Sequence, residues 1–381
     1  MSDPTRILIT GAGGPLGVNV TRSLRAAAST PGAPPATLVG TDCNRWHLPL
    51  ALTDEVVLIP PARDTDAYLA ALGELISARS IDLIVPTHPV EVRTLSAHRN
   101  RFTGVRFMLP PHEAILLAQD KWRTHCLLRD AGLPVPLTRL IGRRSHLDEV
   151  FDELATRPVW VRGAGVPGAG IGVASLPCRE VAHAAAWVDH HQGWGKFIAS
   201  EYLPGANLTW CGLFYRGELV MAQSRERLEY VLPHVSPSGI TGAPAVSRTV
   251  SRPDVRDSGE AAVRALPGPP HGVYFVDLKE DAHGVARITE INAGRFGTTI
   301  HFYTEAGANF VAALAALALG RSLPGAPEGR LFGAPAIDPV APGTYWIRTL
   351  DCGPVLVTDF DHPAEASPDR AGAGSNGTRR G

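Results

Sequence analysis

The amino-acid sequence predicts a protein of mixed α/β and α+β class, built from two or three packed units. A chain of 381 residues is too long for one ordinary hydrophobic core. Short apolar runs alternate with helical stretches through residues 1–112, which is the pattern of a parallel sheet. Two hairpin patterns lie further along, at 196–224 and 272–292, and they predict antiparallel strands.

The first unit, residues 1–112, is expected to form a parallel sheet with helices between its strands. Its short apolar runs alternate with helical stretches, as in βαβ units. The expected strands are 6–10, 37–42, 55–60, 82–87 and 105–110, and the expected helices are 18–28 and 67–80.

The second unit, residues 113–330, combines helices, a glycine-rich loop and hairpins. Residues 112–133 indicate two helices, and residues 158–176 indicate strand, glycine-rich loop and strand. Residues 331–362 contain two further strand-like runs, "TYWIRTL" and "PVLVTDF", expected to pack on this unit. The tail 363–381 has almost no large apolar residue, so we expect it to be disordered.

The end of the second hairpin, "RITEINAGR", concentrates polar side chains on one strand. Glu290 and Asn292 are two residues apart and therefore share a face. If the hairpin closes on a four-residue loop at 281–284, Asp277 lies diagonally across from Glu290, at about 5.5–8 Å. Two carboxylates that close repel unless a cation lies between them. Two acids and an amide suit Mg²⁺, whereas the alternative is a surface hairpin with solvated acids.

A phosphate ligand requires further positive or N–H groups, and three parts of the chain offer them. Arg295 directly follows the acids, and Lys121 lies on a predicted helix, where a lone lysine is ordinarily only solvated. Arg162 ends a strand and precedes a loop whose small residues let backbone N–H groups approach phosphate oxygens. A flexible turn is the alternative. The glycines of that loop, at 163–172, include Gly165, Gly168 and Gly170.

The order of these motifs resembles the ATP-grasp superfamily. It is most similar to carbamoyl-phosphate synthetase large chains, biotin carboxylases and related carboxylate–amine ligases. The likeness covers residues 6 to about 320 and is carried by "QDKWRT", "GLPVP", the glycine-rich loop, "SEYLPG" and "EINAGR". It implies a Rossmann-like pre-ATP-grasp domain (1–112) followed by an ATP-grasp domain (113–330) with a mobile lid at about 134–203.

The resemblance also assigns roles to individual residues. Lys121 and Arg162 would hold the phosphates of ATP, and Arg295 would lie beside the transferred phosphoryl group. One or two Mg²⁺ ions, replaceable by Mn²⁺, would be bound by Asp277, Glu290 and Asn292. The glycine-rich loop would close over the phosphates, and the adenosine would contact Glu201, Tyr202, Leu203 and Asn207.

The implied activity is ATP-dependent ligation of a carboxylate and an amine through an acyl phosphate, with release of ADP and phosphate. Asn207 and Cys211 replace acids that are common in the family, which keeps a non-catalytic nucleotide-binding protein as an alternative. The stretch "TGAGGPLG" supports another alternative, an NAD(P)-dependent oxidoreductase or epimerase. Asp42, at the end of the next strand, would then bind a ribose hydroxyl. Leu16 occupies the position of the third glycine of that fingerprint, so we favour a tight strand–helix turn.

The substrates are expected to be a small-molecule carboxylate and an amine. Arg225 or Arg227 could hold a substrate carboxylate, with a solvated strand edge as the alternative. Thr298, His301 and His88 are further candidates for the acceptor site.

The composition excludes several other classes of partner. The net charge of −1 gives no support for nucleic acid or an anionic membrane. The apolar stretch 309–320 is too short to span a bilayer. Five scattered cysteines and an N-terminus without a signal-peptide pattern favour a cytoplasmic protein. A homodimer is left open.

Overall fold

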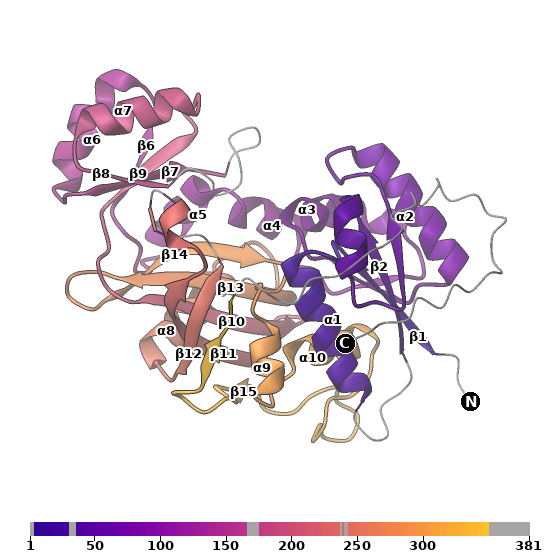
Figure 1. Cartoon of the computed structure of the whole chain (residues 1–381). Coiled ribbons are helices and arrows are strands. Elements are labelled where there is room, and N and C mark those ends of the chain that lie inside the picture. Colours follow the sequence, from indigo (N-terminus) through magenta and orange to yellow (C-terminus); the bar gives the residue numbers. More distant parts are fainter. Residues whose placement is uncertain (1–3, 30–35, 166–174, 237, 240–242, 350–381) are drawn as a thin grey trace.

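A computed structural model describes residues 4–29, 36–165, 175–236, 238–239 and 243–349. The described chain forms three sheets (Figure 1). A parallel sheet lies at the right of Figure 1, a small sheet stands at the upper left, and a large antiparallel sheet lies between and below them. The expected combination of parallel and antiparallel sheets is confirmed.

The parallel sheet has the strand order β3-β2-β1-β4-β5. Its central strands are buried on both sides, which explains their continuous apolar sequence. Helices α1, α2 and α3 connect or flank the strands. The bounds are β1 Thr5–Thr10, α1 Pro15–Ala28, β2 Ala36–Asp42, β3 Glu55–Leu58, α2 Thr65–Arg79, β4 Leu83–Val85, α3 Pro89–Ala97 and β5 Arg106–Phe107.

Two helices lead from this sheet into a small antiparallel sheet of order β6-β9-β7-β8. Helices α6 and α7 pack on it and enclose a separate core that includes Phe151 and Phe197. The bounds are α4 His112–Ala118, α5 Lys121–Asp130, β6 Thr138–Ile141, α6 Leu147–Leu154, β7 Val159–Gly163, β8 Leu176–Cys178, α7 Val181–His190 and β9 Phe197–Ser200.

The large sheet follows the order β14-β13-β10-β11-β12-β16, and β15 pairs with β11. One face packs on α8 through Trp210. The Trp210 ring lies so close to Gly259 of α8 that a side chain at position 259 would have no room. The opposite face packs partly on α10 through Leu213 and carries the polar residues of the next subsection. The bounds are β10 Asn207–Tyr215, β11 Glu218–Tyr230, β12 Pro244–Val250, α8 Pro253–Arg264, β13 Gly272–Glu280, β14 Ala286–Ala293, α9 His301–Glu305, α10 Phe310–Ala318, β15 Ala336–Ile337 and β16 Tyr345–Ile347.

The predicted loop of the second hairpin is one residue too short. Strands β13 and β14 pair Glu280 with Ala286, so five residues, 281–285, form the turn. Asp281 closes it by accepting the backbone N–H of Val285 at 3.0 Å. A bulge at Thr289 then shifts the register, so that Glu290 lies directly opposite Asp277 instead of diagonally.

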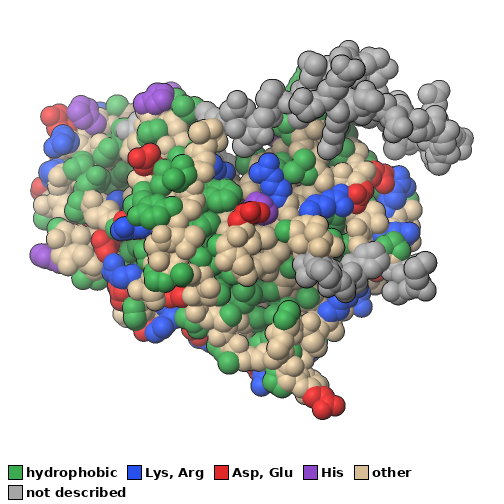
Figure 2. All heavy atoms as spheres, turned by 60° about the horizontal axis from the view of Figure 1, so that its bottom comes forward, with side chains coloured by type: hydrophobic (Ala, Val, Ile, Leu, Met, Phe, Trp, Pro, Cys, Tyr) green, Lys and Arg blue, Asp and Glu red, His purple; other side chains and the backbone are tan. Residues whose placement is uncertain are grey.

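Two surface properties bear on the choice of partner. On the face shown in Figure 2, basic and acidic side chains are interspersed, without one sign prevailing. No helix within the described ranges is long and apolar enough to cross a membrane. The strand-like run 354–360 and the tail 363–381 lie outside the described residues.

Candidate active site

A row of polar side chains crosses the large sheet. Asp277 on β13 lies opposite Glu290 on one side and opposite Thr209 on the other, and Thr209 lies opposite Arg225 of β11. Opposed residues of antiparallel strands share a face, so these side chains project together. The Thr209 hydroxyl donates a hydrogen bond of 2.8 Å to Asp277 Oδ1 and orients that carboxylate.

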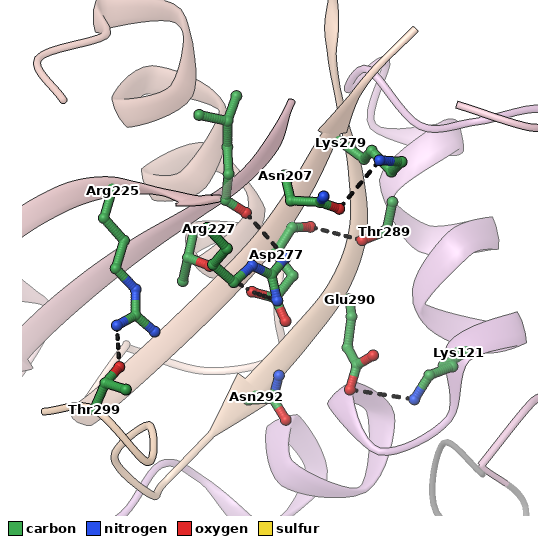
Figure 3. A network of polar contacts seen from close by, with 12 residues as sticks. Lys121, Asn207, Arg225, Arg227, Asp277, Lys279, Thr289, Glu290, Asn292 and Thr299 are labelled. Carbon is green, nitrogen blue, oxygen red and sulfur yellow. Dashed lines mark hydrogen bonds and ion pairs between the residues drawn. The ribbon is translucent and has the colours of Figure 1, made fainter. Parts of the chain in front are cut away.

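Each carboxylate of the row is paired with cations from distant parts of the chain (Figure 3). Lys121 Nζ lies 3.3 Å from Glu290 Oε1, and Arg162 Nη1 lies 3.6 Å from Glu290 Oε2. Arg227 Nη1 lies 3.4 Å from Asp277 Oδ1. Protein cations therefore neutralise both carboxylates in this structure.

The last two predicted residues hold each other. Arg295 Nη2 donates a hydrogen bond of 2.7 Å to Asn292 Oδ1. Gly294, with φ of +82°, turns the chain between them, and a side chain there would contact Val92 and Pro110. The hydrogen bond to Asn292 and the turn at Gly294 therefore hold the Arg295 guanidinium at the edge of the carboxylate row.

Local structure fixes the position of Lys121. Asp120 caps helix α5 by accepting the backbone N–H of Arg123 at 3.0 Å, which makes Lys121 the first helical residue. The backbone N–H of Lys121 donates to the carbonyl of Ala164 at 2.6 Å and joins the start of α5 to the end of β7. Gly165, with φ of +87°, makes this approach possible, because a Cβ there would lie 2.2 Å from the Gln119 carbonyl oxygen.

The electrostatic balance of the site is positive. Burial raises the pKa of Glu290, but the charges of Lys121 and Arg162 outweigh it and hold that pKa at about 2. Glu290 is therefore ionised at neutral pH. With Arg227 and Arg295 included, four cationic side chains face the two carboxylates of the row. This excess suits a ligand with several negative charges.

The two carboxylates of this row line a cavity of about 750 Å³, a volume typical of ligand sites. Its walls come from the small sheet, α5 and the large sheet. It is lined by most of the predicted cofactor and metal residues, namely Lys121, Arg162, Glu201, Tyr202, Leu203, Asn207, Asp277, Glu290, Asn292 and Arg295.

The apolar end of the cavity is formed where β9 leaves the small sheet. The Tyr202 ring lies 6.4 Å from that of Trp160, and Leu203 is buried beside them. Glu201 Oε1 accepts the backbone N–H of Leu137 at 3.0 Å, so one oxygen of the Glu201 side chain is already engaged by the protein.

Sequence reasoning missed four residues in or beside the cavity, namely Lys279, Thr209, Trp160 and Trp187. Lys279 donates to Asn207 Oδ1 at 3.2 Å, and Thr209 orients Asp277. Both lie two residues from a predicted site residue on the same strand, so the period of two could have found them. Trp160 and Trp187 come from the small sheet and α7, and only tertiary packing brings them to the cavity.

The donor set fits Mg²⁺. Two carboxylates and an amide oxygen lie on paired strands, and hard oxygen donors of this kind suit Mg²⁺. Among the described residues no group of three His, Cys, Asp or Glu side chains forms a metal site by itself, so remaining ligands would come from phosphate and water. Cys211 is fully buried in register with Phe275 and offers no ligand to the cavity.

Several predicted substrate residues lie outside this cavity. His301 is buried between α9 and α1, where its ring lies 3.1 Å from Ser23 Oγ and 2.8 Å from a Glu305 oxygen. The carbonyl of Thr298 accepts a hydrogen bond of 3.1 Å from Asn19. Both residues attach α1 to the second half of the chain. Gly168 and Gly170 lie outside the described residues.

His88 lies at the carboxyl end of the parallel sheet. Its Nδ1 accepts the backbone N–H of Val90 at 3.3 Å and caps α3. Burial and the charge of Arg295 lower the pKa of His88, which favours the neutral ring. Beside it, Thr10 donates a hydrogen bond of 2.6 Å to Glu91, and burial raises the pKa of Glu91 to about 7.

The glycine turn at 10–17 is filled by the protein itself. A Cβ on Gly13 would lie 1.9 Å from the backbone oxygen of His47, and one on Gly17 would lie 2.2 Å from that of Gly11. Asp42 accepts the backbone N–H groups of Gly13 at 3.2 Å and of Asn44 at 2.9 Å. Dinucleotide binding is therefore not favoured, and the turn serves strand–helix packing.

Solved structures show which fold this arrangement belongs to. Biotin carboxylase from Campylobacter jejuni, in a complex with an ATP analogue, matches with a TM-score of 0.62 and 15% identity over 84% of this chain and 72% of that one. N5-carboxyaminoimidazole synthetase from Staphylococcus aureus matches with a TM-score of 0.60 and 16% identity, over 85% and 79%. The chain has the ATP-grasp fold.

Two further comparisons agree with the ATP-grasp fold. L-amino acid ligase from Bacillus licheniformis matches with a TM-score of 0.61 and 14% identity, over 84% of this chain and 75% of that one. D-alanine–D-alanine ligase B from Chromobacterium violaceum is 28% identical over 100 residues, which are 26% of this chain and 32% of that relative. The chain thus matches about a third of the length of that relative. No protein-family model matches.

Proposed function

We propose that this protein is an ATP-dependent carboxylate–amine ligase that forms an amide through an acyl phosphate and releases ADP and phosphate. The observation that carries the proposal is the row of Asp277 and Glu290, opposed on paired strands, facing one cavity and surrounded by four cations. The named ligases and carboxylases that share the fold support it.

In this proposal the polar end of the cavity binds the triphosphate. Lys121 and Arg162 move from Glu290 to phosphate oxygens, and Arg295 contacts the phosphoryl group that is transferred. Asp277, Glu290 and Asn292 hold Mg²⁺, which neutralises charge on the phosphates when it is bound. The adenine would bind at the apolar end, which is lined by Tyr202, Leu203 and Trp160.

The reaction then proceeds in two displacements. A carboxylate oxygen of the first substrate attacks the γ-phosphorus, and the bond to the bridging oxygen breaks, leaving ADP. The amine nitrogen of the second substrate attacks the acyl carbon, the bond from that carbon to the phosphate oxygen breaks, and the nitrogen loses a proton. Positioning and charge neutralisation supply most of the catalysis.

One part of the fold is proposed to exclude water, which would hydrolyse the acyl phosphate. The small sheet, within residues 134–203, is proposed as the lid, closing with the loop 163–172 over the phosphates. Residues 1–112 are proposed as the Rossmann-like pre-ATP-grasp domain, because the strand order β3-β2-β1-β4-β5 is that of a doubly wound sheet.

A two-stage experiment tests this proposal. Thermal shift is measured first with ATP plus Mg²⁺ and with NAD, and only ATP plus Mg²⁺ is expected to raise Tm. ADP release is then measured over a panel of carboxylate–amine pairs, with product masses recorded. Asp277→Asn is the inactive comparison, and Asp257→Asn on the exposed surface of α8 is the matched control. A Tm raised by NAD alone, or ADP release that Asp277→Asn leaves unchanged, would contradict the proposal.

A further inference from the structure

The arginine beside the carboxylate row is buried without an acidic partner. Arg225 is 5% exposed, and its guanidinium forms no ion pair with any carboxylate in the described part of the chain. Its Nη1 donates to the neutral hydroxyl of Thr299, and its Nε has no hydrogen-bond partner there. Arg162 and Arg227, by contrast, each lie beside a carboxylate of the row.

Two further unpartnered polar groups belong to residues near Arg225. The hydroxyl groups of Tyr303 and Ser247 are buried and lack hydrogen-bond partners among the described residues. The Tyr303 ring lies 5.9 Å from the Arg225 guanidinium. Ser247 lies on β12, diagonally across from Arg225 on the same face of the sheet, at about 5.5–8 Å. We call Arg225, Thr299, Tyr303 and Ser247 the Arg225 cluster.

A cluster of this composition lacks one chemical component, an anion. Arginine does not lose its proton in proteins, and a buried charge without a counter-charge is strongly unfavourable. A carboxylate would accept two parallel hydrogen bonds from the guanidinium fork and further ones from the two hydroxyl groups. The unpartnered donors are therefore explained together by one carboxylate ligand.

The cluster adjoins the proposed phosphate site. Arg225 and Arg227 are two residues apart on β11 and share a face, and Arg227 lines the cavity. Two strand spacings, about 10 Å, separate Arg225 from Asp277 across Thr209. In Figure 3 the Arg225 side chain extends toward Thr299, on the chain segment that follows Asn292. The cluster and the carboxylate row therefore lie on one face of the sheet.

We propose that the Arg225 cluster binds the free carboxylate of the amine substrate, so that the acceptor is an amino acid or a short peptide joined through its amine. This inference rests on the proposed ligase function and narrows it, since amines without a carboxylate become poor acceptors. The carboxylate at the cluster does not react. It orients the acceptor so that the amine faces the acyl phosphate.

Binding is tested first, with Mg²⁺ and a non-hydrolysable ATP analogue already bound to the full chain. The probes are a pool of the twenty common L-amino acids and the matching pool of their carboxamides. The acid pool is expected to raise Tm and the amide pool to do so much less. Arg225→Met is expected to abolish the difference. Arg248→Met should keep it, because Arg248 forms a partly exposed ion pair with Glu226 on the neighbouring strand.

Kinetics provide the second readout. In the ADP-release assay, Arg225→Met should raise KM for the acceptor about 10- to 100-fold, as expected for loss of a charge-assisted pair of hydrogen bonds, with KM for ATP unchanged. Arg225→Lys keeps the charge but loses the fork, and it should give a smaller increase. If the Arg225→Met variant no longer binds the ATP analogue, the Arg225→Lys variant is used in its place.

The outcomes separate the two proposals. If Mg²⁺ and the ATP analogue do not stabilise the wild type, the ligase proposal fails and takes this inference with it. If ADP release depends on an acceptor, but carboxamides serve as well as acids, the ligase proposal stands and the Arg225 assignment is overturned. Unchanged acceptor KM in both Arg225 variants overturns it as well.

Discussion

Replacing Glu290 by glutamine should separate the two functions of that side chain. In the ligand-free protein Glu290 neutralises Lys121 and Arg162, and in the proposed complex it holds Mg²⁺. Glutamine has the same shape but no charge, so Glu290→Gln leaves no cavity. The variant should be less stable without ligand and should lose the dependence of ATP binding on Mg²⁺.

The size of the stability loss follows from the pKa of Glu290. A folded-state pKa of about 2, against about 4.3 for a free glutamate, corresponds to roughly 3 kcal/mol at neutral pH. The side chain is 26% exposed, and solvent screening reduces the figure to about 2 kcal/mol. Because this pKa is depressed, the contribution is present above about pH 4.3 and is lost as the pH falls toward 2.

Differential scanning fluorimetry measures both effects. The ligand-free variant should melt roughly 4 °C below the wild type. ATP without metal should stabilise it at least as much as the wild type, because Lys121 and Arg162 no longer have a competing carboxylate. Adding Mg²⁺ should then give little further shift. Glu218→Gln, in an exposed pair with Arg330, is the matched control.

One result would refute this reasoning. If Glu290→Gln keeps both the wild-type Tm and the Mg²⁺-dependent stabilisation by ATP, Glu290 is an ordinary solvated acid. The proposed metal site would then lose one of its two carboxylates.

Three further predictions concern other parts of the fold. The free energy of unfolding should fall by up to about 3 kcal/mol between about pH 4.5 and 7, because the raised pKa of Glu91 favours the protonated folded state, and Glu91→Gln should remove this fall. Urea unfolding at several pH values measures it. A dependence of stability on pH that the substitution leaves unchanged contradicts it. Gly13→Ala should destabilise the protein by at least about 1–3 kcal/mol, since its Cβ would meet the His47 carbonyl oxygen at 1.9 Å; a wild-type Tm would exclude that contact. Thr209→Val should raise the Mg²⁺ concentration for half-maximal ATP stabilisation about tenfold, because the hydrogen bond to Asp277 is lost; an unchanged titration would show that it orients nothing.

The acidic part of the site could be predicted from the sequence because it is local. Alternation on one strand puts Glu290 and Asn292 on the same face whatever surrounds them, and an unambiguous hairpin brings Asp277 close. At the acids the register was wrong by two residues, one from the five-residue turn and one from the bulge at Thr289, and neither leaves a signal in the side-chain pattern.

The cations of the site come from separate elements, and no periodicity connects them. Lys121 and Arg162 were assigned by resemblance, and packing of α5 against the end of β7 is what carries them to Glu290. Sequence spacing also grouped His301 with the acceptor site, whereas the fold buries it against α1. Spacing along a chain says nothing about which side of a short helix faces a neighbouring domain.

By itself the sequence therefore determined the class of sheets, the hairpin and the pairing of acids, all of which follow from alternation and turn chemistry between near neighbours. The tertiary structure decided which cation neutralises which acid, that the turn at 10–17 is closed by the chain, and that Arg225 is buried without a counter-charge. Those outcomes depend on burial and on contacts between residues far apart in sequence, where charge and shape act only after the chain has folded.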